Sequence, residues 1–178
     1  MKANNKAIFL DRDGVINKVL LRKGMPFSPR TVNDFRLISG IDGVLRHFRK
    51  NGLLNIVITN QPDIARGFLK KCELNKMHAI IKKILPIDVI MVCPHDDKDH
   101  CSCRKPKPGM LFAAANKFNI ELNKSFLIGD TERDVIAGRS AGCATIIIDT
   151  KYNKDVKADY RVRNLKDAIK IILNGRTQ

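Results

Sequence analysis

Short runs of apolar and β-branched residues alternate along the chain with longer segments in which apolar residues recur every three or four positions. The short runs predict strands at residues 7–10, 53–59, 88–92, 125–128 and 144–148. They are apolar throughout rather than at every second position, which is typical of parallel strands buried on both faces. The longer segments predict helices at residues 41–50, 71–85, 108–118, 131–141 and 165–173.

The order of these elements predicts the fold class. Strands that alternate with helices indicate an α/β protein built on an open, doubly wound parallel sheet, whose ligands bind beyond the carboxyl ends of the strands. Residues 19–40 are the one long stretch without a predicted element, and a loop of that length is usually functional or mobile. We expect a single domain over residues 1–178, with little room for a separate cap domain.

The charge of the chain changes this picture only a little. It carries 33 Lys and Arg against 18 Asp and Glu, a formal net charge of +15. Basic proteins often bind nucleic acid, but these cations are spread over the whole chain. With no Trp and two Tyr, side chains that stack on bases are scarce, so a nucleic-acid partner is not expected. Solvated helix faces, or attraction of a small phosphorylated substrate, explain the charge better.

The apolar runs are also too short for a membrane protein. None approaches the ~18 residues that span a bilayer. The first run, residues 7–10, is shorter than the apolar core of a signal peptide, which has roughly 7–15 residues. We therefore expect a cytoplasmic monomer without membrane association.

Two carboxylates follow directly on the first predicted strand, in the sequence Asp11-Arg12-Asp13-Gly14. Asp11 and Asp13 are two positions apart, so in extended backbone they emerge on the same side. A carboxylate at a strand end can attack phosphorus and form an aspartyl-phosphate. The second carboxyl group can give a proton to the leaving alcohol and later take one from water. On its own, this pair fits a surface turn equally well.

Polar residues at the ends of the other strands favour the catalytic interpretation. Thr59 and Asn60 end the second predicted strand, and Asp130 ends the fourth. Asp130 and Asp11 could share Mg²⁺, which favours one or two carboxylates together with phosphate oxygens. Asp134, one helical turn later, could orient Asp130 or a metal-bound water. Lys105 could neutralise the charge that develops on a transferring phosphoryl group.

A cysteine cluster predicts a second metal site. Cys93, His95, Cys101 and Cys103 provide three thiolates and one imidazole, the closed set that holds structural Zn²⁺. His100 and the nearby aspartates are alternative ligands. The zinc would staple a loop without hydrogen-bonded structure of its own, which leads directly into residues 104–105. The remaining histidines and cysteines are expected to be ordinary. His47 and His78 are expected to be solvated helix residues, Cys72 to lie on a helix and Cys143 to lie beside a strand.

Four segments of the chain resemble the motifs of haloacid dehalogenase (HAD) superfamily phosphatases. They are residues 9–17, 59–61, 104–106 and 129–134. The resemblance extends over most of the chain and is strongest to the sugar and histidinol phosphatase branch, in particular to the heptose bisphosphate phosphatases. It implies an enzyme that hydrolyses the phosphomonoester of a small phosphorylated sugar with the help of Mg²⁺, and that carries a structural zinc loop.

The resemblance also assigns roles to individual residues. It implies that Asp11 is the nucleophile, that Asp13 is the general acid and base, and that Asp11, the Asp13 main-chain carbonyl and Asp130 hold Mg²⁺. It further implies a set of substrate contacts: Asn17, Thr59, Asn60, Arg104 and Lys105.

Three other functions stay open at this point. A histidinol-phosphate phosphatase shares all four motifs. A DNA 3′-phosphatase resembles residues 59–67 and suits the positive charge. A non-catalytic zinc module that binds nucleic acid would also be basic.

Overall fold

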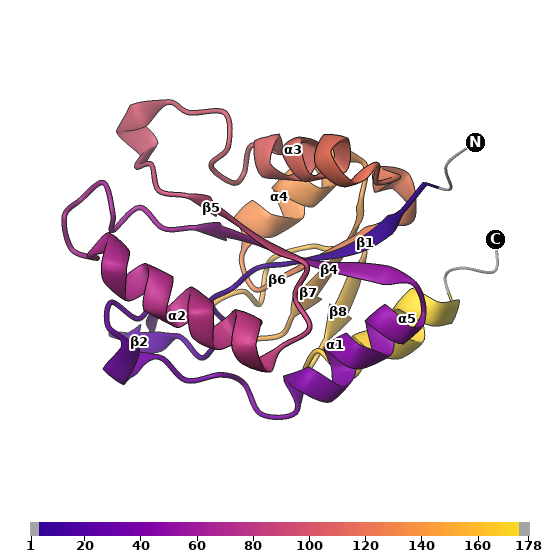
Figure 1. The fold of residues 1–178 in the computed structure, drawn as a ribbon, viewed down its shortest axis with the longest axis horizontal. Coiled ribbons are helices and arrows are strands. Elements are labelled where there is room, and N and C mark those ends of the chain that lie inside the picture. Colours follow the sequence, from indigo (N-terminus) through magenta and orange to yellow (C-terminus); the bar gives the residue numbers. More distant parts are fainter. Residues whose placement is uncertain (1–3, 175–178) are drawn as a thin grey trace.

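The protein is described here by a computed structural model in which residues 4–174 are placed (Figure 1). Six parallel strands form one central sheet in the order β5-β4-β1-β6-β7-β8. Their bounds are β1 (Lys6–Leu10), β4 (Leu53–Asn60), β5 (Val89–Cys93), β6 (Phe126–Gly129), β7 (Ala144–Ile148) and β8 (Tyr160–Val162).

Helices cover both faces of this sheet (Figure 1). Those on one face are α1 (Ile41–Lys50), α2 (Lys71–Ile84) and α5 (Ala168–Asn174), and those on the other are α3 (Gly109–Phe118) and α4 (Glu132–Ala141). The doubly wound α/β fold that the sequence predicts is therefore confirmed.

Strand β1 shows why the sheet strands are apolar throughout. Successive side chains of a strand point to opposite faces. Ile8 and Leu10 belong to the core beneath α1, α2 and α5, whereas Ala7 and Phe9 belong to the core beneath α3 and α4. All four side chains are fully buried. A strand covered on both faces has no solvent side, so polar residues occur only where it ends.

The stretch at residues 19–40, expected to be irregular, contains a short hairpin of β2 (Leu20–Arg22) and β3 (Met25–Phe27) and a 3-10 helix, η1 (Val32–Asp34). Both residues of the hairpin turn, Lys23 and Gly24, have positive φ. Most hairpin side chains are exposed, so the two strands carry no alternating apolar pattern that sequence analysis could detect. The edge strand β8 was not predicted either, because a run of three residues is too short to show a pattern.

The carboxyl ends of β1, β4 and β6 lie at one edge of the sheet. Strand β1 pairs with β4 on one side and with β6 on the other. The chain proceeds outward from β1 through β4 to β5 and then returns to β6, so the order of strands reverses between β1 and β6. Ligands of doubly wound sheets bind at this switch point. Within residues 4–174, no helix is long and apolar enough to cross a membrane.

Candidate active site

Three carboxylates meet at the switch point of the sheet. Asp11 follows β1, Asp130 follows β6, and Asp134 lies in the first turn of α4; one oxygen of each lies within 4.8 Å of the others. All three residues are buried. The backbone of Gly14 approaches so closely that a Cβ there would lie 2.0 Å from Asp130 Oδ2, and its φ is +86°. Glycine at this position therefore lets the turn after β1 pack against Asp130.

Lys105 provides the positive charge of this cluster. Its ammonium group donates hydrogen bonds to Asp11 Oδ1 at 2.8 Å, to Asp134 Oδ1 at 2.5 Å and to the Ile58 carbonyl at 2.9 Å. Burial by itself would lower the pKa of Lys105, but the charges of Asp11 and Asp134 outweigh it and raise the pKa. Lys105 is therefore cationic at neutral pH.

Asp134 is fully engaged with its neighbours. One oxygen accepts from Lys105, and the other accepts from the Thr131 amide at 3.1 Å and the Thr131 hydroxyl at 2.6 Å. The sequence suggested that Asp134 orients Asp130 or a metal-bound water. In the structure its two oxygens hold Lys105 and the start of α4.

Asp130 keeps one oxygen without a partner. Oδ2 accepts a hydrogen bond from the Tyr152 hydroxyl, and the Asp130 carbonyl accepts from Asn153 Nδ2 at 2.7 Å. Oδ1 is buried yet has no hydrogen-bond partner among the described residues. Sequence reasoning missed Tyr152 and Asn153; the available signal was that both lie in the loop after β7, at the same edge of the sheet.

The electrostatics of the cluster favour a bound cation. Burial raises the pKa of Asp11, the charge of Lys105 lowers it, and the charge of Asp134 raises it further. The result is a pKa of about 7. Burial and the charge of Asp11 raise the pKa of Asp130 to about 8. A single lysine does not offset three neighbouring carboxylates. The unpartnered Asp130 oxygen and the oxygen-only donor set therefore fit Mg²⁺.

Asp13 lies outside this cluster and is surrounded by donors. Its carboxylate accepts from Arg12 at 2.9 and 3.0 Å, from Asn17 at 2.8 Å, from Ser28 at 2.8 Å and from Gln61 at 2.9 Å. Burial opposes ionisation, but Arg12 and the hydrogen bonds from Asn17 and Ser28 outweigh it and lower the pKa of Asp13. The carboxylate is therefore ionised in the unliganded site.

The remaining predicted substrate residues take different positions. Asn60 binds the backbone of Lys105 through both ends of its amide, at 2.9 and 3.0 Å, and so fixes the ammonium group from β4. Thr59 is buried, and its hydroxyl accepts from Gln61 at 2.8 Å. Asn17 is buried behind Asp13. Of these three residues, only Asn60 lines the open cavity above the carboxylates.

His78 differs from the expectation of a solvated helix residue. It is half-buried on α2, and its Nε2 lies 3.3 Å from Arg12 Nη1. Because arginine only donates, Nε2 accepts and the proton of a neutral ring lies on Nδ1. Burial and the charge of Arg12 lower the pKa of His78 to about 4. The neutral ring thus supports the guanidinium group that holds Asp13.

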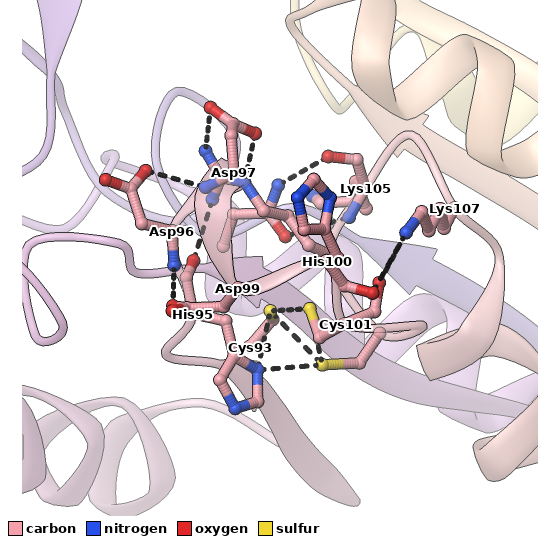
Figure 2. Close-up of polar contacts among 12 residues, drawn as sticks. Cys93, His95, Asp96, Asp97, Asp99, His100, Cys101, Lys105 and Lys107 are labelled. Atoms are coloured by element: carbon pink, nitrogen blue, oxygen red, sulfur yellow. Dashed lines mark hydrogen bonds and ion pairs between the residues drawn. The ribbon is translucent and has the colours of Figure 1, made fainter.

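The predicted zinc ligands also converge (Figure 2). The Cys93 sulfur lies 3.2 Å from that of Cys103 and 3.6 Å from that of Cys101. His95 Nδ1 lies 3.6 Å from Cys93 Sγ and 3.4 Å from Cys103 Sγ. A tetrahedral zinc with bonds of about 2.3 Å separates its sulfurs by about 3.8 Å. His100, the alternative ligand, does not belong to this group of four.

The loop between these ligands has more structure than expected. It contains a 3-10 helix, η2 (Asp97–Asp99), which begins with a capping box formed by Asp96 and Asp99. Asp96 accepts from Arg66 at 2.6 Å, and Asp97 accepts from Arg104 at 2.7 Å (Figure 2). The hydrogen bond from Arg66 lowers the pKa of Asp96 to about 2. The loop therefore orients two arginines of the neighbouring cavity.

A cavity of about 440 Å³ opens over Asp11 and Asp130. Its walls come from four segments of the chain, each of which follows a different strand of the sheet: residues 13–30, 60–68, 104–105 and 130–133. The volume is in the range of small-molecule sites. A carboxylate beside a buried ammonium group, facing such a cavity, is the arrangement that the sequence motifs predict for a HAD-like phosphatase.

Comparisons with known proteins agree with this class. The HAD-hydrolase-like family model matches residues 102–168. A D-glycero-alpha-D-manno-heptose-1,7-bisphosphate 7-phosphatase of Campylobacter jejuni is 36% identical over 169 residues, 92% of this chain and 94% of that protein. A D-glycero-beta-D-manno-heptose-1,7-bisphosphate 7-phosphatase of Helicobacter pylori strain J99 is 34% identical over 176 residues, 95% of this chain and 98% of that protein.

A solved structure shows the same fold. The crystal structure of D,D-heptose 1.7-bisphosphate phosphatase from B. bronchiseptica, complexed with magnesium and phosphate, has a TM-score of 0.82 and 26% identity, and the match covers 96% of this chain and 99% of that one. The chain therefore belongs to the family of HAD-like phosphatases that includes these heptose bisphosphate 7-phosphatases, and it is a phosphatase. The resemblance noted in the sequence is confirmed.

Proposed function

We propose that this phosphatase removes the 7-phosphate of D-glycero-D-manno-heptose 1,7-bisphosphate, the substrate that the names of its relatives give. The observation that carries the proposal is the pairing of Asp11 with Lys105 at 2.8 Å in a cavity that Asp130 also lines. Histidinol phosphate and DNA 3′-phosphate are not favoured, since the relatives reported above are heptose bisphosphate phosphatases.

Mg²⁺ is the proposed cofactor. Asp11, the main-chain carbonyl of Asp13 and Asp130 would hold it, and the unpartnered Oδ1 of Asp130 supports this assignment. When bound, the ion supplies positive charge that stabilises the phosphoryl oxygens in the transition state. The related enzyme from B. bronchiseptica was crystallised with magnesium and phosphate.

Asp11 and Asp13 would share the chemistry in two steps. An oxygen of Asp11 attacks phosphorus, the bond from phosphorus to the sugar oxygen breaks, and that oxygen takes a proton from Asp13. Asp13 then takes a proton from water, whose oxygen attacks the aspartyl-phosphate and releases inorganic phosphate and free Asp11. Because Arg12 and Asn17 stabilise the ionised form of Asp13 in the unliganded site, Asp13 would take up from solvent, once the substrate is bound, the proton that it gives to the leaving oxygen.

Lys105 would stabilise the transferring phosphoryl group without gaining or losing a proton. Its ammonium group donates to Asp11 and Asp134, and Asn60 holds its backbone in place. The ammonium group is already in position before the reaction. No side chain or water has to reorient when negative charge develops on the phosphoryl oxygens, and this makes a fixed cation effective in a buried site. Thr59 would contribute its hydroxyl at the same end of β4.

Zn²⁺ is the proposed occupant of the second cluster. Cys93, His95, Cys101 and Cys103 offer four protein ligands, which leaves no position open for water, so the proposed role is structural. We further propose that the protein works as a cytoplasmic monomer, one domain over residues 1–178 without a cap. Its partner would then be a small sugar phosphate, with neither nucleic acid nor membrane involved.

The test is phosphate release from a panel of three substrates, with and without Mg²⁺: heptose 1,7-bisphosphate, histidinol phosphate and a 3′-phosphorylated oligonucleotide. We expect Mg²⁺-dependent release with the highest kcat/KM on the heptose bisphosphate. A higher kcat/KM on either of the other two substrates would contradict the proposed substrate. Binding of a nucleic-acid duplex without hydrolysis of any of the three substrates would contradict the proposed phosphatase reaction itself.

A further inference from the structure

Four arginines line the cavity above the carboxylates, and three of them are held by carboxylates of the protein. The guanidinium group of each of these three forms an ion pair with an aspartate. The pairs are Arg30 with Asp63 at 2.7 Å, Arg66 with Asp96 at 2.6 Å, and Arg104 with Asp97 at 2.7 Å. The fourth arginine, Arg133, has neither an ion pair nor a hydrogen bond to any residue between 4 and 174. Among the described residues, Arg133 is thus the arginine of this wall whose donors are all unused.

The position of Arg133 makes this charge unusual. It lies in the first turn of α4, where the helix dipole disfavours a cation. The carboxylate beside it in sequence, Asp134, is already satisfied by Lys105 and Thr131 and so does not neutralise it. The side chain is exposed and borders the cavity, so an anion in the cavity can reach it without breaking an internal contact.

Arg133 lines the same cavity as Asp11 and Asp130. It follows Asp130 by three residues, and the N-terminal end of α4 lies between them, with Asp130 just before the helix and Arg133 in its first turn. The positive charge of Arg133 helps to lower the pKa of Asp97, the carboxylate that pairs with Arg104. Arg133 therefore lies near the loop that carries the cysteine cluster. A substrate in this cavity can therefore contact both Asp11 and Arg133.

We propose that Arg133 binds the phosphate group that stays on the sugar while the other phosphate reacts at Asp11. This inference rests on the proposed function, because it requires a substrate with two phosphate groups. A guanidinium group can donate two parallel hydrogen bonds to a phosphate. Arg133 offers all its donors for this purpose, whereas Arg104 spends part of its own on Asp97. Arg133 is then a determinant of specificity for bisphosphates over simple monoesters.

The experiment measures kcat and KM of Arg133→Ala on heptose 1,7-bisphosphate and on p-nitrophenyl phosphate, which has a single phosphate. A lost charged hydrogen bond lowers affinity roughly ten- to hundredfold, so we expect kcat/KM to fall by that factor on the bisphosphate, mainly through KM. We expect a change of less than about twofold on p-nitrophenyl phosphate. Arg133→Lys, which keeps the charge but not the fork of donors, should recover part of the loss.

Arg139→Ala is the matched control, since Arg139 is an exposed arginine of the same helix that pairs with Asp159 and does not line the cavity. It should leave both substrates unaffected. Equal losses on the two substrates, or no loss on the bisphosphate, would overturn the role of Arg133 while the proposed function stands. A wild-type enzyme that cleaves p-nitrophenyl phosphate but not the bisphosphate would overturn the proposed substrate and the role of Arg133 together.

Discussion

The ammonium group of Lys105 lies 2.8 Å from the carboxylate of Asp11, although the two residues are 94 positions apart in the chain. Asp11 follows the central strand β1, and Lys105 follows the loop after β5 that carries the cysteine cluster. The pair is buried, and Asp134 and the Ile58 carbonyl hold the same ammonium group from other sides. The proposed nucleophile and the cation that contacts it are thus positioned by separate parts of the fold.

Lys105→Met should lower kcat by roughly 10²–10³, the loss typical of a donor that stabilises transition-state charge. It should also destabilise the metal-free protein, because Asp11 and Asp134 lose their shared cation and stay buried. Steady-state kinetics and thermal denaturation measure the two effects. Lys117→Met, an exposed lysine on α3, is the control and should change neither. A Lys105 variant with wild-type kcat would contradict the proposed role.

Asp11→Asn should abolish turnover and leave the fold intact. Burial raises the pKa of Asp11 to about 7, so the ionised carboxylate is less favourable in the folded chain than in the unfolded one. A neutral side chain of the same shape should therefore make the metal-free protein at least as stable as wild type at pH 8. Phosphate release and thermal denaturation test both statements. Full activity in this variant would refute the assignment of the nucleophile.

The stability of the metal-free protein should decrease as the pH rises from about 4 to 8. The pKa values of Asp11 and Asp130 are raised in the folded state, to about 7 and about 8, from an ordinary value of 3.8. Between these values the folded chain binds more protons than the unfolded chain, so each rise in pH favours unfolding. Denaturant titrations across this range measure the slope.

Mg²⁺ should reverse this pH dependence. Protons and the metal ion compete for the same carboxylates, so the increase in Tm caused by Mg²⁺ should be small at pH 5 and largest above pH 8. Asp130→Asn is the control, and it should show a shallower slope without metal and little response to Mg²⁺. An equal shift in Tm at pH 5 and pH 8 in the wild-type protein would argue against a carboxylate site.

Tyr152→Phe should weaken Mg²⁺ binding. The Tyr152 hydroxyl donates to Asp130 Oδ2 and orients the carboxylate whose other oxygen is free for the metal. Removal of such a supporting hydrogen bond typically costs roughly 10- to 100-fold in metal affinity. The Mg²⁺ concentration at half-maximal activity should rise by about that factor, while kcat at saturating Mg²⁺ changes little. Tyr160→Phe, at an exposed position on β8, should behave as wild type.

Cys103→Ser should release zinc and loosen the loop that carries Asp96 and Asp97. These two aspartates hold Arg66 and Arg104 against the cavity, so we expect a lower Tm and a higher KM. Metal analysis by mass spectrometry should find one zinc per wild-type chain and none in the variant. Cys72→Ser, at an exposed cysteine outside the cluster, is the matched control. Retention of zinc by Cys103→Ser would exclude Cys103 as a ligand.

The sequence by itself determined the architecture and the edge of the sheet where chemistry occurs. Strands buried on both faces must be apolar throughout, so β1, β4 and β6 were recognisable from local composition, and Asp11 and Asp130 were conspicuous because they follow such strands. The cysteine and histidine spacing identified the second cluster for a similar reason: the ligands lie within one short segment.

Only the tertiary structure decided how the polar side chains pair. Which loops meet above the sheet decides that Arg12 and Gln61 hold Asp13 and that Tyr152 supports Asp130. It also decides that Arg133 has no hydrogen-bond partner among the residues that the structure describes. Local periodicity carries no information about such contacts, because they join residues that are distant in the chain and are set by strand order and register. The physical reason is that burial imposes a repeating pattern on apolar residues, whereas a hydrogen bond constrains only the two groups that make it.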